Sequence, residues 1–145
     1  MYYLDWLIPK LTTLPEKQIA LKEIAESIRT LELSCEALQA SGVEPARISK
    51  RPTKAEEAYL DNLCEREQLQ KNLEITRREV DQMERMLALL ADDERLVLDR
   101  FYINRQKNHL RLLCEELACE EAQVYEIKSR AAIKLARMLF GNVTA

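Results

Sequence analysis

The chain has 145 residues, of which 47% are apolar and 32% are charged. This balance is typical of one globular domain or two small ones, and it excludes an intrinsically disordered chain. The formal charge of −3 at pH 7 excludes a general attraction to nucleic acid, so any such binding has to come from local clusters of basic residues.

The positions of glycine and proline predict the type of secondary structure. The only glycines are Gly42 and Gly141, and the four prolines all precede residue 53. Neither residue type occurs between Thr53 and Phe140, where a sheet protein would need turn residues throughout. The sequence therefore predicts an all-α protein whose helices are joined by polar turns.

The first eight residues are mostly apolar, but they include no basic residue, and the run stops at Pro9. Because a secretion signal starts with a positively charged segment, we expect none here. No stretch reaches the length of a membrane span. We expect a cytoplasmic protein with no membrane partner.

Residues 1–91 are predicted to form a helical hairpin that follows a short N-terminal helix. Its first long helix should run from about residue 15 to residue 40, with Pro15 in the first turn and Gly42 beyond the last. Apolar residues recur every seven positions in two rows, namely Leu14, Leu21, Ile28 and Cys35, and Ile24, Leu31 and Leu38. This spacing indicates a helix that packs along a seam.

The second long helix should run from about residue 54 to residue 90, after a loop at residues 41–53. Thr53 and Glu56 have the spacing of a capping box. The seam of this helix consists of Tyr59, Leu69, Leu73, Val80, Met83, Leu87 and Leu90, and it is interrupted by Asn62, Arg66 and Thr76. The interruptions and the short loop favour antiparallel pairing within the chain, with Leu31 and Leu38 nearer to Tyr59 than to Leu87.

Residues 92–145 are predicted to form a three-helix domain. Asp92 is a favourable N-cap, and Asp93 and Glu94 suit the first helical turn. The buried face of this helix should consist of Leu96, Val97, Phe101 and Tyr102. The polar residues 104–109 break the pattern, and two further helices should follow at about residues 110–118 and 121–140.

The last two helices fit the packing pattern of a helix-turn-helix unit. Its first helix needs bulky apolar residues four apart with a small residue between them, because the second helix crosses there; Leu113, Cys114 and Leu117 fit. The inner face of the second helix should consist of Val124, Ile127, Ala131 and Leu135. This pattern leaves open a second interpretation, in which three amphipathic helices pack together without binding DNA.

Three segments of the last third resemble region 4 of bacterial sigma factors: DERLVLDRFY at 93–102, LCEELA at 113–118 and VYEIKSRAAIKL at 124–135. The resemblance covers about a third of the chain, and residues 127–135 are its most specific part. It implies a helix-turn-helix that binds double-stranded DNA, with RNA polymerase as a further candidate partner.

A helical hairpin followed by such an end also resembles small phage regulators of late genes, of the ArpU and RinA type. This looser resemblance implies a transcription regulator that is encoded by a phage or prophage. The chain has no counterpart of the sigma segment that melts promoter DNA, so we do not expect a complete sigma factor.

The resemblance also implies a DNA-binding site. The base-reading positions of the family correspond here to Glu121, Ala122, Tyr125 and Glu126, and Gln123 lies beside them. Glutamate can accept a hydrogen bond from cytosine, and tyrosine can touch a thymine methyl group or a phosphate. The expected phosphate contacts are basic residues that flank this face, namely Arg105, Lys107, Arg111, Lys128 and Arg130.

Two positions depart from the family pattern. Ala118 or Cys119 stands where the family turn has glycine, and Glu120 stands where serine or threonine caps the recognition helix. A second basic cluster lies in the hairpin loop and consists of Arg47, Lys50, Arg51 and Lys54. We interpret that cluster as solvated surface.

The sequence offers no catalytic or metal-binding chemistry. Four cysteines occur without a CxxC pair, and His109 is the only histidine, so we expect no zinc site, no cofactor and no enzyme. We expect Cys35, Cys64, Cys114 and Cys119 to be reduced thiols that face the helical core.

Two other functions remain open. A phage packaging protein of the small-terminase type also joins a helix-turn-helix to a helical oligomerisation unit, and a protein-only adaptor could bind through the acidic residues of the third region. Ring-shaped oligomers in solution favour packaging, whereas a monomer or a homodimer favours regulation.

Overall fold

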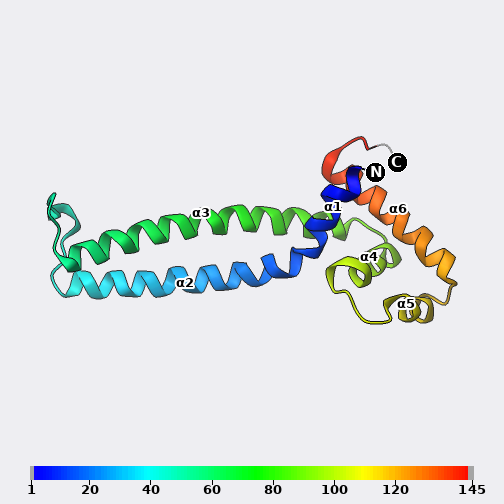
Figure 1. The fold of residues 1–145 in the computed structure, drawn as a ribbon, viewed down its shortest axis with the longest axis horizontal. Coiled ribbons are helices and arrows are strands. Elements are labelled where there is room, and N and C mark those ends of the chain that lie inside the picture. Colours follow the sequence, from blue (N-terminus) through cyan, green and yellow to red (C-terminus); the bar gives the residue numbers. More distant parts are fainter. Residues whose placement is uncertain (1, 144–145) are drawn as a thin grey trace. The chain divides into compact units, whose positions relative to one another are not determined.

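A computed structural model describes residues 2–143 of the chain, and every regular element in that range is a helix (Figure 1). The elements are α1 (Tyr2–Thr12), α2 (Leu14–Ala40), the 3-10 turn η1 (Pro45–Arg47), α3 (Lys54–Ala88), α4 (Asp92–Leu98), the π-helical segment η2 (Asp99–Ile103), α5 (His109–Leu117) and α6 (Glu121–Phe140). The predicted all-α fold is confirmed.

The helix ends differ from the expected ones by at most two residues. Helix α3 ends at Ala88 because the amides of Leu89 and Leu90 bond to carbonyls only three residues back, which tightens the last turn. The N-cap of α4 is Ala91 and not Asp92, since the Glu94 side chain accepts the Ala91 N–H at 3.0 Å. Helix α6 has the expected bounds.

Helices α2 and α3 pair in antiparallel fashion, as predicted. Within residues 19–78, Asn62 Nδ2 donates to the Leu31 carbonyl at 2.8 Å, whereas the earlier residue Tyr59 packs with the later residue Cys35. Leu38 lies against the same cluster. Partner positions therefore run in opposite directions along the two helices.

The polar interruptions of the α3 seam belong to this helix pair. Asn62 is buried, and its Oδ1 accepts a hydrogen bond of 2.7 Å from Arg66 Nε. The Arg66 Nη2 lies 3.5 Å from Cys35 Sγ on α2. The seam thus contains a short polar network, which satisfies the groups that interrupt the apolar pattern.

The chain forms two compact units: residues 2–18 with 79–143, and residues 19–78. This grouping differs from the division at residue 91 that the sequence led us to expect. Helix α1 is the reason, because it packs against α6 and η2 and fully buries Leu7 and Leu11. The end of α3 belongs to the same unit, where Gln18 Nε2 donates to Glu84 Oε1 at 2.9 Å.

The last three helices share a core that consists of Val97, Phe101, Leu113, Val124 and Ile127. Every one of these residues belongs to the buried faces predicted from the sequence. Ala131 and Leu135 are fully buried further along α6. The core holds α6 by one face and leaves the opposite face of its first half in solvent.

Candidate nucleic-acid interface

The turn between α5 and α6 is tight and left-handed. Ala118 ends α5 with φ 51° and ψ 48°, which is the conformation that favours glycine. The Cys119 N–H bonds to the Cys114 carbonyl at 3.2 Å, and the extended backbone of Glu120 then starts α6 without a side-chain cap. Ala118 thus adopts, without being glycine, a left-handed conformation that is unfavourable for a residue with a side chain.

The N-terminal half of α6 exposes the residues that the sequence assigns to base contacts. Glu121, Ala122, Gln123, Tyr125 and Glu126 are all exposed. Val124 and Ile127, three residues apart on the opposite face of α6, pack into the core and fix this half of the helix. The result is a firmly held helix whose outer face carries three carboxylates when Glu120 is included.

An aromatic cluster surrounds the ammonium group of Lys128. Its Nζ lies 4.8 Å from the ring centroid of Phe101, 5.4 Å from that of Tyr125 and 5.9 Å from that of Tyr102. His109 packs edge-on against Phe101 with ring centroids 4.5 Å apart. These contacts hold the Lys128 charge beside the exposed half of α6 through cation–π attraction.

Helical spacing predicts that Phe101 and Tyr102 belong to the core, but it does not predict this cluster. One contact of this cluster can be predicted from the sequence, because Tyr125 and Lys128 are three residues apart and must share a face of their helix. The contribution of η2 could not be foreseen. There the Asn104 N–H bonds to the Asp99 carbonyl at 2.7 Å, five residues back, which changes the direction of the neighbouring side chains.

Burial raises the pKa of the Tyr102 phenol, and the charge of Arg105 opposes that shift.

Arg105 and Lys107 lie in the exposed turn before α5, and neither forms an ion pair within residues 2–143. Arg111 is also exposed, but its Nε lies 3.7 Å from Glu115 Oε1 on the same helix. The three predicted phosphate contacts thus differ in how much of their charge is free.

Arg130 has a different environment from the other predicted phosphate contacts. Its guanidinium lies 3.3 Å from carboxylate oxygens of both Asp93 and Glu94, at the start of α4. Lys134 Nζ lies 3.4 Å from the other oxygen of Glu94. Arg130 therefore ties α6 to α4, and most of its charge is compensated inside the domain.

Glu94 is buried to 3% exposure, which alone would raise the pKa of its carboxyl group. The hydrogen bond from the Ala91 amide, followed by those from Arg130 and Lys134, outweighs burial and lowers that pKa below its ordinary value. Next to it, Arg95 donates to the carbonyls of Leu87 and Leu90 at 3.1 Å and caps the end of α3. The acidic and basic residues of the sigma-like segment thus have structural partners.

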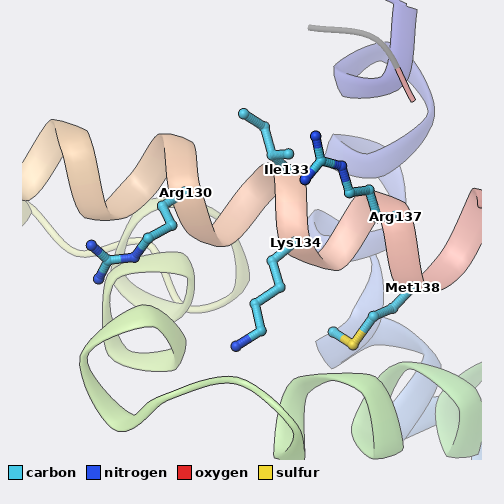
Figure 2. Close-up of a pocket in the computed structure, with 5 residues that line it drawn as sticks. All are labelled: Arg130, Ile133, Lys134, Arg137 and Met138. Carbon is cyan, nitrogen blue, oxygen red and sulfur yellow. The ribbon is translucent and has the colours of Figure 1, made fainter. Parts of the chain in front are cut away.

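A groove of about 690 Å³ follows the second half of α6 (Figure 2). Its walls combine cationic with apolar side chains, namely Arg130, Ile133, Lys134, Arg137 and Met138. Two of the cations are those that pair with Glu94. This groove lies beyond the exposed residues 121–126 and does not include them.

Residues 2–143 contain no cluster of three or more histidine, cysteine or acidic side chains that could hold a metal ion. No helix in that range combines the length and the apolar character needed to cross a membrane. All four cysteines are unpaired; Cys35 is buried, but Cys64 is exposed because it lies outside the α3 seam, so its predicted core position was wrong.

Comparison with protein-family models, with curated proteins and with solved structures gives no match to this chain.

Proposed function

We propose that this chain is a DNA-binding transcription regulator that reads duplex DNA with the N-terminal half of α6. The observation that carries the proposal is the exposure of Glu121, Gln123, Tyr125 and Glu126 on a helix whose inner face is fixed by a core. A base-reading helix needs a rigid base and polar side chains that are free to meet base edges. Helix α5 and the left-handed turn at Ala118 supply that support.

The phosphate contacts of this proposal are the cations that form no ion pair with an acidic residue of the described structure. Lys128 is held beside the exposed half of α6, and Arg105 and Lys107 lie in the turn before α5. Such flanking charges fix the register of a recognition helix on the DNA backbone without reading its sequence. Arg130 contributes less to this set, because Asp93 and Glu94 already compensate its charge.

The resemblance of residues 93–135 to sigma region 4 supports promoter DNA as the target and RNA polymerase as a further partner. The same proposal includes an origin in a phage or prophage. The apolar residues of the three sigma-like segments include five that are buried in the structure, namely Val97, Leu113, Val124, Ile127 and Leu135. The fold is thus compatible with the proposed assignment.

The proposal is tested by fluorescence anisotropy titrations of the full chain with promoter duplexes from the parent genome, at several salt concentrations. The logarithm of the binding constant should fall linearly with the logarithm of salt concentration, by about 0.9 per phosphate contacted. Lys128→Gln should weaken binding to all sequences and reduce that slope by roughly one contact. Gln123→Ala should instead alter the preference among sequences, because Gln123 can reach base edges.

Lys71→Gln is a matched control, since Lys71 is an exposed lysine on α3 and its loss changes the net charge equally. Arg130→Gln should lower the melting temperature and change the salt slope less than Lys128→Gln does. Absence of binding by the wild-type chain at low salt contradicts the proposal and favours the adaptor function. Ring-shaped oligomers in light scattering would favour packaging.

A further inference from the structure

We propose that the tip of the hairpin is a second nucleic-acid contact, which binds the phosphodiester backbone without reading sequence. The tip loop is defined as residues 45–54, between the end of α2 and the first residue of α3. Its ligand class rests on the proposed function, but its residues lie outside the helix-turn-helix. From the sequence alone, its basic cluster is interpreted as solvated surface.

The tip loop is anchored at both ends. Val43, two residues before the loop, is buried, and Ile48 within the loop is half-buried; both pack with Cys35, Leu38 and Tyr59 of the helix pair. At its end, the Thr53 N–H donates to Glu56 Oε1 at 2.9 Å and the Glu56 N–H donates to Thr53 Oγ1 at 3.2 Å, which completes the predicted capping box.

The middle of the loop is also restrained. Ser49 Oγ accepts the Arg51 N–H at 3.3 Å and donates to the Arg51 carbonyl at 3.2 Å. Pro45 and Pro52 fix the backbone φ angle on either side. The cations between these points therefore lie on an ordered backbone. Less conformational entropy of the loop is lost when a ligand binds.

The charge of the tip loop is of one sign. Arg47, Lys50, Arg51 and Lys54 are exposed, and residues 45–54 include no acidic residue. Arg47 pairs with Glu44 at 3.0 Å, whereas Lys50, Arg51 and Lys54 form no ion pair within the described structure. The rest of residues 19–78 carries more acidic than basic side chains. The loop is thus a local positive site on an otherwise acidic unit.

The chemistry of the loop favours phosphate over a protein or a lipid surface. The central anchors of protein interfaces are enriched in aromatic residues and arginine, and stable membrane binding combines basic residues with apolar side chains or a lipid anchor that enters the bilayer. In the tip loop the large apolar residue Ile48 is turned towards the helix pair. The long side chains that the loop exposes to solvent are therefore cationic, and such charges suit the phosphates of a nucleic-acid backbone.

The test compares three charge variants of the full chain, each with three cations changed to glutamine. The tip variant is Lys50→Gln, Arg51→Gln and Lys54→Gln. The interface variant is Arg105→Gln, Lys107→Gln and Lys128→Gln. The control variant is Lys22→Gln, Lys71→Gln and Arg77→Gln, which removes the same charge from exposed sites elsewhere on the hairpin helices. Circular dichroism checks that all three remain folded.

Binding to long mixed-sequence duplexes is measured against salt. We expect the tip variant to lose affinity at low salt and to reduce the salt slope by roughly 2.7, which corresponds to three phosphate contacts, while the control variant keeps the wild-type slope. If only the interface variant weakens binding, the tip proposal is overturned and the proposed function stands. If only the tip variant weakens binding, the tip proposal stands and the proposed function fails. Loss of binding to anionic vesicles, with unchanged DNA binding, would overturn the tip proposal in favour of a lipid surface.

Discussion

Arg130, in the middle of α6, lies 3.3 Å from the carboxylate of Glu94, which is buried at the first turn of α4. Lys134 reaches the second oxygen of the same carboxylate. The two cations are half-exposed, so water can solvate them if the carboxylate is removed, whereas Glu94 has little access to water of its own. These two ion pairs therefore contribute to stability mainly because they compensate the buried charge of Glu94.

Glu94→Gln should lower the free energy of unfolding by about 2 kcal/mol at neutral pH, because hydrogen bonds to a charged group are worth about 1.5–3 kcal/mol each and the amide can still accept the Ala91 N–H. The pKa of Glu94 is lowered in the folded state, so its contribution is present above the unfolded value of about 4.3 and is lost as the pH falls through the folded value. Denaturant titrations from pH 7 to pH 3 should show the two proteins converge in stability.

The control is Glu115→Gln, which removes an exposed partner of Arg111 and should change stability by less than about 1 kcal/mol. A difference between wild type and Glu94→Gln that grows on acidification would contradict the assigned direction of the pKa shift.

Ala118→Gly should stabilise the protein by up to about 1 kcal/mol, since glycine adopts the left-handed conformation of this turn without steric cost. Thermal melts measure the change. Ala25→Gly is the matched control on the exposed face of α2, where the same substitution should destabilise by about 1 kcal/mol. Changes of the same sign at both positions would mean that Ala118 is not left-handed in solution.

Asn62→Ala should destabilise the hairpin by about 1–3 kcal/mol, because it removes the bond to the Leu31 carbonyl and leaves Arg66 Nε without its acceptor. Asn72→Ala, on the exposed side of α3, removes a hydrogen bond to Gln68 and should change stability little. Chemical denaturation followed by circular dichroism compares the two variants. Equal stability of both would show that the buried network contributes nothing.

Much of the fold was predictable because most of its apolar residues follow helical spacing. Every residue of the two rows from Leu14 to Leu38 is buried or partly buried, and Val124, Ile127, Ala131 and Leu135 are all buried. The left-handed conformation of Ala118 agrees with the resemblance to sigma region 4, whose turn has glycine at this place. Local spacing and local turn chemistry determine these features, and both can be read from the sequence.

The rest depends on contacts between distant positions, which spacing does not reveal. Nothing near α1 indicates that Trp6 meets Phe140, with ring centroids 5.6 Å apart. The pairing of Arg130 with Glu94 likewise joins residues that are 36 positions apart. An exposed arginine on a helix is equally consistent with a phosphate contact or an internal ion pair, and only the fold distinguishes them.

The packing of α1 on α6 makes the C-terminal unit discontinuous along the chain, because its first piece precedes the hairpin and its larger piece follows it. During synthesis, α1 leaves the ribosome long before its partner helix exists, so this unit cannot complete its packing until α6 has been made. The hairpin is in effect an insertion whose two ends return to one unit. Evolution can therefore lengthen or shorten it by matched heptads in both helices without disturbing the residues that the C-terminal unit needs to fold.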